Sequence, residues 1–488
     1  MSEFAKISKN DTIKILAKIL IVFFLLAAVF YWASGEQLFF LNEEETSITP
    51  KYTAAVMDEG TKVEFTIQPK ADYLDSIAPL IGTYGRENEG YLLFQVFAED
   101  GRLLSETQLP TRDLKDYVNQ NIVFDTPIGN VKGERLTVAV TACDVPAGQA
   151  VSMWYGTDIN TGKFSIPDMN GNTFSVNGVV TDGKICYTAS GRNILWIGHW
   201  YWWIVLGIGL LLTLGTLYTV RTMNREKDTL IGGGIALVKR YSFLVRQLVT
   251  RDFKRKYKRS VLGVLWSFLN PLLTMLVQYF VFSTIFKSTI DNFIVYLLSG
   301  IILFNFFGES VSLGLSSIVD NAHLITKVYM PKEIYPLSRV LSSLINLVLS
   351  LVPLFAVMLL TGVPFTKSMF LIPIVVLCMI FFCMGMSLLL STSMVFFQDT
   401  MFLWSVLSTL WNYLTPTFYP VSIIPEKWLP IYKLNPMYQY ITFLRSILLD
   451  GKAPSPELYA GCILSAGVVF ALGLVVFRKN QNKFVLHL

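Results

Sequence analysis

The residue types that usually carry chemistry are sparse in this sequence, and their spacing matches no common catalytic site. The three His and five Cys lack metal-ligand spacing, and neither CxxC nor GxxxxGK[ST] occurs. Paired carboxylates and a nucleophile with a neighbouring base are also absent from the sequence pattern. We therefore expect no catalytic residue, no metal and no cofactor in this chain itself.

One acidic residue, Glu309, stands inside an apolar stretch, LFNFFGESVSLGL. A carboxylate at membrane depth is energetically costly, so Glu309 is a candidate functional residue. The alternative is a structural carboxylate that is hydrogen-bonded to neighbouring helices. The other apolar stretches contain few ionisable residues, which argues against a proton- or sodium-coupled carrier.

The elements that position these residues are predicted to be membrane-spanning helices. The chain has a mean hydropathy of +0.50 and several uncharged blocks near the roughly 20 residues that cross a bilayer. We expect about eight spans, with both termini in the cytoplasm because Lys and Arg gather in the assigned inner segments. The expected spans are residues 15–33, 196–220, 261–286, 293–317, 337–361, 369–396, 401–416 and 457–477.

Two segments of this prediction have alternatives. Residues 15–33 could be a signal peptide, but their length and bulky aromatic end favour an uncleaved anchor. Residues 417–456 are assigned to an outer connection, in which YITFLRSILLDG is too short to span and could form a re-entrant or interfacial helix.

Residues 35–198 have a different pattern. Runs such as TKVEFTIQP and GERLTVAVTACDV alternate apolar and polar residues, and AEDGRL is typical of a hairpin turn. Short strands at this spacing predict an antiparallel β-sandwich, which we expect to be extracytoplasmic because a span lies on each side. There, Cys143 and Cys186 could form a disulfide or remain two thiols. Trp154 and Tyr155 could stack on sugar, although a place in the sandwich core is favoured.

The predicted fold class is thus an α-helical polytopic membrane protein with an inserted extracytoplasmic all-β sandwich domain. The expected organisation is a cytoplasmic N-terminus and first helix over 1–34, the β domain over 35–198, a second helix over 199–220, a basic linker and interface helix over 221–260, and a six-helix domain over 261–488.

A basic cluster begins near residue 251 and leads directly into an expected span. Before it, apolar residues recur at helical spacing, which predicts an amphipathic helix in the inner membrane interface; a basic linker is the alternative. The residues assigned to this interface helix are Leu237, Tyr241, Leu244, Leu248, Arg251 and Lys254.

Residues 318–336 connect two expected spans on the cytoplasmic side. Their pattern predicts a short helix ended by Pro331, and such a helix could dock on another protein; a plain loop is the alternative. The candidate docking residues are Asn321, Ala322, His323, Leu324, Ile325, Thr326 and Lys327.

Four motifs carry a resemblance to a known family. They are RDFKRKYKRSVLGVLWSFLNPLL, NAHLITKVYMPKEIYPLSRV, FFQDTMFLW and PTFYPVSIIPEKWLPIYKLNPM, within about residues 237–488. In order and spacing the chain resembles the membrane subunit of ABC-2 type exporters of polysaccharide, teichoic acid or O-antigen. It departs from the family in having Gln398 where an Arg usually precedes Asp399, and in the two spans and β domain over residues 1–230.

The resemblance implies a homodimer bound to two copies of a cytoplasmic ABC ATPase, which would bind ATP and Mg. It implies that residues 321–331 form the coupling helix and residues 237–257 the interface helix. The implied function is export of a lipid-linked polysaccharide, on an undecaprenyl carrier, across the bacterial cytoplasmic membrane. No enzymatic activity of the chain itself and no nucleic-acid partner are expected.

Aromatic walls would suit such a cargo, because sugars offer hydroxyl groups and apolar C–H faces. Most aromatic residues of a membrane domain face lipid or core, so we expect only a minority to line a path. The candidates are Trp266, Tyr279, Phe282, Phe304, Phe307, Trp404, Trp411, Tyr413, Phe418 and Tyr419. Two alternative functions are an ABC-2 exporter of a drug, lipid or peptide, and a membrane-anchored glycan-assembly enzyme or sensor that uses the β domain.

Overall fold

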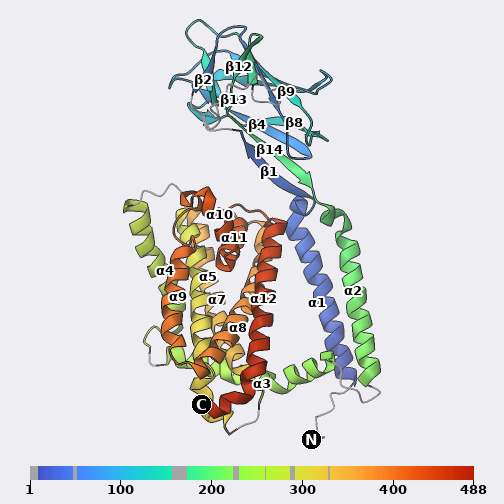
Figure 1. The fold of residues 1–488 in the computed structure, drawn as a ribbon, viewed down its shortest axis with the longest axis vertical. Coiled ribbons are helices and arrows are strands. Elements are labelled where there is room, and N and C mark those ends of the chain that lie inside the picture. Colours follow the sequence, from blue (N-terminus) through green and yellow to red (C-terminus); the bar gives the residue numbers. More distant parts are fainter. Residues whose placement is uncertain are drawn as a thin grey trace. The chain divides into compact units, whose positions relative to one another are not determined.

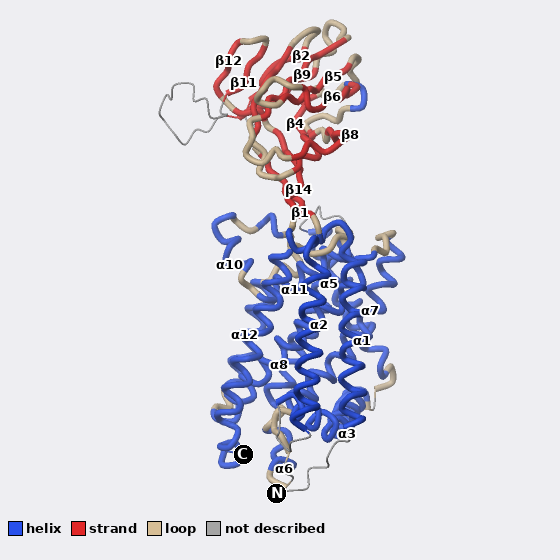
Figure 2. The backbone as a smooth tube through the Cα atoms, turned by 90° about the vertical axis from the view of Figure 1, so that its right-hand side faces the viewer, coloured by secondary structure: helices blue, strands red, loops and turns tan. Residues whose placement is uncertain are grey.

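The computed structural model describes residues 9–47, 52–156, 173–223, 230–258, 260–285, 292–327 and 330–487. The chain divides into two compact units. One comprises Met1–Gly35 together with Trp202–Leu488, and the other is Glu36–Tyr201. The first is helical, and the second is built from strands (Figures 1 and 2).

The strands of the second unit form two antiparallel sheets. One has the order β1-β14-β4-β10-β13, with β2 beside β10 and with β7 and β8 beside β4; the other has the order β12-β11-β3-β9-β5-β6. The strands are β1 (Phe40–Thr46), β2 (Tyr52–Met57), β3 (Lys62–Ile67), β4 (Tyr73–Gly82), β5 (Tyr91–Phe97), β6 (Leu103–Pro110), β7 (Val118–Asn119), β8 (Ile122–Gly129), β9 (Leu136–Cys143), β10 (Val151–Gly156), β11 (Thr173–Val176), β12 (Val179–Asp182), β13 (Lys184–Ile185) and β14 (Tyr187–Ile194).

The alternating pattern of the sequence explains this sandwich. Val63, Phe65 and Ile67 on β3 are buried, whereas Lys62 is exposed. They join Ile77 and other residues of the opposite sheet in one apolar core. The predicted hairpin is confirmed, since β5 pairs with β6 around a turn in which Gly101 has a left-handed φ of 82°. The inserted β domain is therefore confirmed.

Cys143 and Cys186 are both free thiols in the structure and do not form the alternative disulfide. Burial raises the pKa of Cys186 to about 11, because the protein interior disfavours the thiolate. This thiol is therefore protonated and unreactive at neutral pH.

The helical unit contains the remaining elements. They are α1 (Lys9–Ser34), α2 (Trp196–Met223, which begins within the other unit), α3 (Leu230–Tyr257), α4 (Trp266–Tyr279), α5 (Phe293–Ser316), α6 (Ala322–Ile325), α7 (Ile334–Thr361), α8 (Ile372–Phe396), α9 (Thr400–Leu414), α10 (Leu429–Lys433), α11 (Pro436–Leu448), α12 (Pro456–Asn480) and α13 (Phe484–His487).

Helix α5 lies at the centre of this unit, packed against α7, α8, α9 and α11 (Figure 1). Of its most apolar stretch, 72% is buried, whereas the corresponding stretches of α1 and α2 are only 17% buried. The last turns of α1 pack on the segment Lys367–Leu371, where the rings of Trp32 and Phe370 are 5.3 Å apart. The added N-terminal helix thus contacts the edge of the helical unit and not its centre.

Seven helices in the described part of the chain are long and apolar enough to cross a membrane, one fewer than the expected number of about eight. The exception is the predicted span 401–416. Helix α9 has 15 residues and is therefore only about 22 Å long, short of the roughly 30 Å of a hydrocarbon core.

The chain nevertheless runs along most of α5 between residues 404 and 419. The Trp404 indole N–H donates to Ser312 Oγ (3.2 Å), the rings of Trp411 and Phe307 are 5.2 Å apart, and Tyr296 Oη donates to the Tyr419 carbonyl (2.8 Å). As the segment proceeds from Trp404 to Tyr419, its contacts on α5 move back from Ser312 to Tyr296, so the segment is antiparallel to α5. A short helix and a non-helical continuation, Thr415–Tyr419, together follow α5 to its beginning.

Helices α8 and α12 pack closely because two glycines lie at their contact. A Cβ atom added to Gly473 would lie 2.4 Å from the Gly385 carbonyl oxygen, and one added to Gly385 would lie 2.5 Å from the Val469 carbonyl. The obstructing atoms are backbone, so the helices would have to separate. Close approach of small residues is the usual basis of helix packing in membranes.

We predict that Gly473→Ala lowers the free energy of unfolding by roughly 1–3 kcal/mol, because the added methyl group overpacks this contact. Thermal unfolding of the purified protein in detergent measures the effect. Gly467→Ala on the same helix is the matched control, since a Cβ there meets nothing within 4 Å. Equal melting temperatures for both variants would contradict the assigned packing.

Candidate functional site

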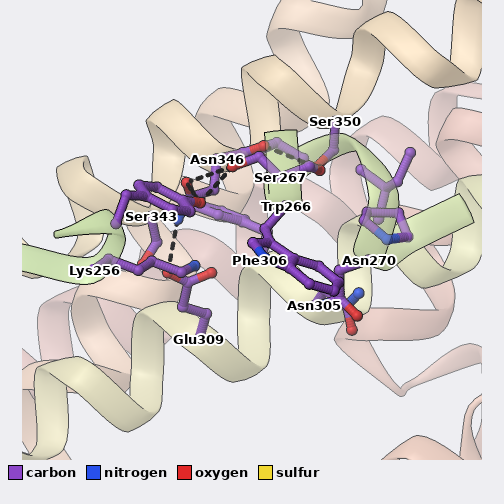
Figure 3. A pocket seen from close by; sticks show the side chains of 14 residues that line it. Lys256, Trp266, Ser267, Asn270, Asn305, Phe306, Glu309, Ser343, Asn346 and Ser350 are labelled. Carbon is purple, nitrogen blue, oxygen red and sulfur yellow. Dashed lines mark hydrogen bonds and ion pairs between the residues drawn. The ribbon is translucent and has the colours of Figure 1, made fainter. Parts of the chain in front are cut away.

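A polar cavity of about 260 Å³ lies within the helical unit, between the C-terminal end of α3 and helices α4, α5 and α7 (Figure 3). Its walls combine amide, hydroxyl and charged groups with three aromatic rings. It is lined by Lys256, Tyr257, Trp266, Ser267, Asn270, Pro271, Ile302, Asn305, Phe306, Glu309, Ser343, Asn346, Leu347 and Ser350.

Glu309 is the acidic centre of this cavity. Its Oε1 accepts hydrogen bonds from Lys256 Nζ (2.7 Å) and Asn346 Nδ2 (2.8 Å). The carboxylate therefore joins three helices, with a cation from α3 and an amide from α7. Glu309 is thus hydrogen-bonded to neighbouring helices, as expected for a structural carboxylate. It nevertheless lines a cavity instead of being enclosed by other side chains.

Hydroxyl groups extend the cluster along α4 and α7. Tyr257 Oη donates to Asn346 Oδ1 (2.8 Å) and is also hydrogen-bonded to Ser267 Oγ. Ser350 Oγ lies 2.8 Å from the Asn346 carbonyl and 3.1 Å from the Ser267 carbonyl. Paired charges, amides and hydroxyls beside the Trp266 and Phe306 rings could hold a polar, uncharged ligand group. They do not form a nucleophile and base pair.

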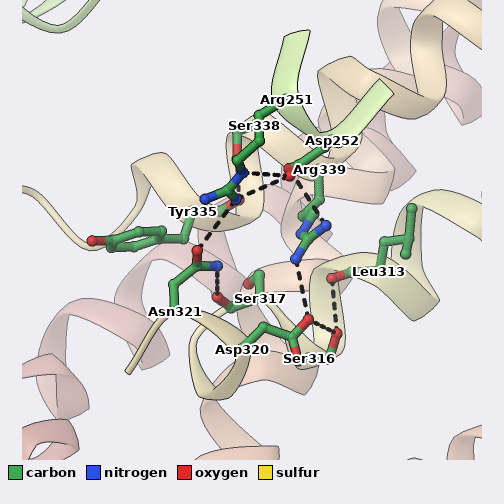
Figure 4. A network of polar contacts seen from close by, with 10 residues as sticks. All are labelled: Arg251, Asp252, Leu313, Ser316, Ser317, Asp320, Asn321, Tyr335, Ser338 and Arg339. Atoms are coloured by element: carbon green, nitrogen blue, oxygen red, sulfur yellow. Dashed lines mark hydrogen bonds and ion pairs between the residues drawn. The ribbon is translucent and has the colours of Figure 1, made fainter. Parts of the chain in front are cut away.

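A charged network connects α3, α7 and the segment before α6 (Figure 4). Asp252, almost fully buried, forms ion pairs with Arg251 (2.9 Å) and Arg339 (3.4 Å). Arg339 also pairs with Asp320 (3.1 Å), and Arg251 Nη2 donates to Asn321 Oδ1 (3.3 Å). Residues 320–321 are therefore joined directly to α3 and α7 by ion pairs and hydrogen bonds.

The predicted docking residues separate into two groups in the structure. His323, Thr326 and Lys327 are exposed, and Ala322 and Leu324 are half-buried. Asn321 and Ile325 are buried; Asn321 Nδ2 donates to the Ser317 carbonyl (2.8 Å). The buried side chains of Asn321 and Ile325 thus pack within the segment, and the exposed side chains are the ones available for contact with another protein. The regular helix α6 covers only residues 322–325, and residues 328–329 lie outside the described residues.

Helix α3 contains the predicted interface residues. Leu248 is buried, Tyr241 and Leu244 are half-buried, and Arg251 and Lys254 are exposed. The side chain of Leu237 lies outside the described residues. Spacing of three and four residues thus places the apolar side chains on one face of the helix.

The aromatic candidates for a path are dispersed. Trp266 lines the polar cavity. Phe282 stacks on Phe418, with ring centroids 4.9 Å apart, and Tyr413 is exposed. Phe307 and Trp404 lie in the core of the helical unit. Phe307 is fully buried because the Phe304, Phe382, Trp404 and Trp411 rings enclose it. The others, Tyr279 and Tyr419, lie near Phe293 and Phe418.

Arg445 is a buried residue that the sequence reasoning missed, because its segment was assigned to an outer connection. On α11, its Nη1 donates to the Pro416 carbonyl (2.7 Å), and its Nη2 donates to those of Thr417 (2.7 Å) and Tyr296 (3.2 Å). A cation within the apolar run YITFLRSILL was the available signal. Most of the residues of α11 are likewise buried.

We predict that Arg445→Gln and Arg445→Lys lower the free energy of unfolding by roughly 3 kcal/mol, because neither side chain can donate to all three buried carbonyls. Thermal unfolding in detergent measures this loss. Arg478→Gln is the control, because Arg478 is 62% exposed and forms only a surface ion pair with Glu333. Wild-type melting of the Arg445 variants would show that the guanidinium does not support the non-helical segment.

Among the described residues, no group of three or more His, Cys, Asp or Glu side chains could hold a metal ion. The described part of the helical unit presents a polar cavity and a network of charged contacts. These features lie in the part of the chain that comparisons with known proteins cover.

Residues 244–449 match the family model described as ABC-2 type transporter. The chain is similar to an O-antigen export system permease protein, RfbA, of Myxococcus xanthus, with 34% identity over 250 residues, which are 50% of this chain and 95% of that protein. It is also similar to two Klebsiella pneumoniae proteins of the same name, each 29% identical over 49% of this chain and 92% of the relative. Nearly complete coverage of these relatives, with spans of the required length, establishes that the chain belongs to the ABC-2 type transporter family and is a multi-pass membrane permease.

Proposed function

We propose that this chain is the transmembrane subunit of an ATP-driven exporter that moves a lipid-linked cell-surface polysaccharide out across the bacterial cytoplasmic membrane. The observation that carries the proposal is the similarity, over nearly the whole length of the relative, to proteins named as O-antigen export permeases. In this arrangement both termini are cytoplasmic and the β-sandwich unit is extracytoplasmic. The carrier of the glycan is an undecaprenyl lipid.

The energy comes from a partner. Two copies of the permease bind two copies of a cytoplasmic ABC ATPase, and ATP and Mg are held there. The exposed side chains His323, Thr326 and Lys327 contact that ATPase, and the buried Asn321 carries the displacement inward. The network of Asp320, Arg339, Asp252 and Arg251 supports this role, because it joins the docking segment to α3 and α7 through direct ion pairs and hydrogen bonds.

The same two helices form walls of the polar cavity, so displacement of α3 or α7 changes its shape. The cavity has groups that suit sugar hydroxyls and an indole ring that suits a sugar C–H face. An ABC-2 exporter of a drug, lipid or peptide is the second candidate, favoured only by the membership of the broad family. Nothing among the described residues favours a glycan-assembly enzyme.

The test is gentle purification of the tagged protein from its native membrane, followed by mass spectrometry of the associated molecules. We expect a near-stoichiometric ABC ATPase and a polyprenyl-linked glycan. Deletion of the gene should also remove the polysaccharide from the cell surface. An ATPase without glycolipid would favour the drug, lipid or peptide exporter, and the absence of any ATPase would overturn the proposal.

We predict that reversing charge at the exposed docking surface, in the double variant His323→Glu and Lys327→Glu, removes most of the copurifying ATPase without lowering the melting temperature. Both side chains are exposed, so the fold loses little. Lys479→Glu, an exposed charge reversal at the end of α12, should retain the ATPase. Asn321→Ala should instead destabilise the protein, by roughly 1–2 kcal/mol, because it removes a buried hydrogen bond. Retention of the ATPase by the double variant would contradict the assigned docking surface.

We predict that Asp252→Asn uncouples the exporter. The ATPase should still bind and hydrolyse ATP, but export should fall roughly tenfold, since coupling free energies of about 1–3 kcal/mol are typical. The physical reason is that two guanidinium groups would lose the carboxylate between them. Export and ATP hydrolysis are measured together in proteoliposomes, with Glu457→Gln, an exposed carboxylate on α12, as the control. Parallel loss of both activities would argue against a transmission role.

A further inference from the structure

Two exposed tyrosines of the β-sandwich unit have an unusual backbone conformation. Tyr84 follows β4 with φ of 59°, and Tyr117 precedes β7 with φ of 55°. Both lie in the left-handed region, which bulky side chains seldom adopt because the Cβ atom approaches the following carbonyl. Their side chains are nevertheless 52% and 53% exposed, so packing in the core does not explain the choice of tyrosine.

The two loops are fixed to one another. Asp116 Oδ1 accepts hydrogen bonds from the backbone N–H groups of Thr83 (2.7 Å) and Tyr84 (3.1 Å). The Tyr117 N–H donates to the Ile81 carbonyl (3.1 Å). One carboxylate therefore holds the Tyr84 backbone against the residue that precedes Tyr117, and both rings are carried by a rigid double loop.

A third ring belongs to the same surface. Trp154, on β10, packs edge-on against Tyr117, with ring centroids 5.1 Å apart and an interplanar angle of 85°. Its indole nitrogen is buried beside Gly82, where an added Cβ would lie 2.8 Å away. The polar edge of the indole is thus buried, while Trp154 as a whole is only partly buried. This differs from the core position that the sequence favoured for Trp154.

Polar side chains border the rings. Arg86 lies over the Tyr84 ring, 5.3 Å from its centroid, and its Nη2 donates to the Ala150 carbonyl (3.0 Å). Glu87 and Lys115, in the same two loops, are exposed. Fixed aromatic faces beside charged hydrogen-bonding groups match a pyranose ring, which presents apolar C–H faces and a rim of hydroxyls. Rigid tyrosines also lose little conformational entropy on binding.

We propose that Tyr84, Tyr117 and Trp154 form a carbohydrate-binding surface that holds sugar residues of the exported polysaccharide. This inference rests on the proposed function and adds to it a specific role for the β-sandwich unit. Strain at functional positions is retained when the residue is needed for its side chain and not for stability. Tyrosine at these two positions therefore serves ligand binding at the expense of the fold.

The backbone conformation provides a sharp test. Tyr84→Gly and Tyr117→Gly remove the aromatic ring, but glycine adopts left-handed φ without steric cost. The full-length variants, singly and together in nanodiscs, are titrated with end-labelled polysaccharide that has been released from the lipid of the native host, and anisotropy gives Kd. Leu103→Ala is the matched control, because Leu103 is a 46% exposed apolar residue elsewhere on the same unit.

We expect each glycine variant to raise Kd roughly five- to tenfold, because it loses the apolar contact between one ring face and the sugar. The double variant should raise Kd further. Melting temperatures should be unchanged or higher. If a glycine variant melts lower, Tyr84→Asn and Tyr117→Asn, which also tolerate this conformation, replace it.

An unchanged Kd in the double variant, or no binding of the polysaccharide to the wild-type protein, would overturn the carbohydrate surface. So would a loss of export with unchanged glycan binding, which would indicate a protein partner at these loops. None of these results affects the proposed exporter function, which is tested separately by the copurifying ATPase and glycolipid and by loss of surface polysaccharide on gene deletion.

Discussion

The helical unit depends on the requirement that backbone polar groups in apolar surroundings have hydrogen-bond partners. Long helices meet it by themselves, but the chain leaves helical geometry between Thr415 and Tyr419 while it is still buried. Arg445 and Tyr296 supply the missing donors for these carbonyls. One buried guanidinium and one phenol therefore help to hold the non-helical continuation of α9 between α5 and α11.

The same principle concentrates polar residues at the opposite end of α5. Glu309 is tolerated because Lys256 and Asn346 satisfy it, and Asp252 is tolerated because two arginines do. Both clusters draw on the last turns of α3 and on α7, so the two helices cannot move without rearranging them. The segment around Asp320 and Asn321 is thus connected to the cavity walls through a few short contacts, which is the physical continuity that coupling between two sites can use.

The two units differ in where they place energetically costly residues. The helical unit pairs the carboxylates of Asp252 and Glu309 with cations, whereas the β-sandwich unit accepts strain at two exposed tyrosines whose rings contribute little to its core. In the sandwich core, alternation of apolar and polar residues is sufficient to bury one face of each strand, as β3 and β5 show. Conformational cost at surface loops, without a packing reason, is what separates a binding surface from an ordinary turn.

The sequence by itself determined the membrane class, the helical spans of full length, the inserted sandwich and the family, because these depend on local periodicity, length and motif order. It also indicated Glu309, since a single charge in an apolar run is visible without a structure. Only the tertiary structure decided that 401–416 is a short helix with a non-helical continuation, that Phe307, Trp404, Asn321 and Ile325 are buried, and that Arg445 and Asp252 are central. Burial and partner choice arise from contacts between residues far apart in the sequence, such as Arg445 and Tyr296, which are 149 positions apart, and no local pattern encodes them.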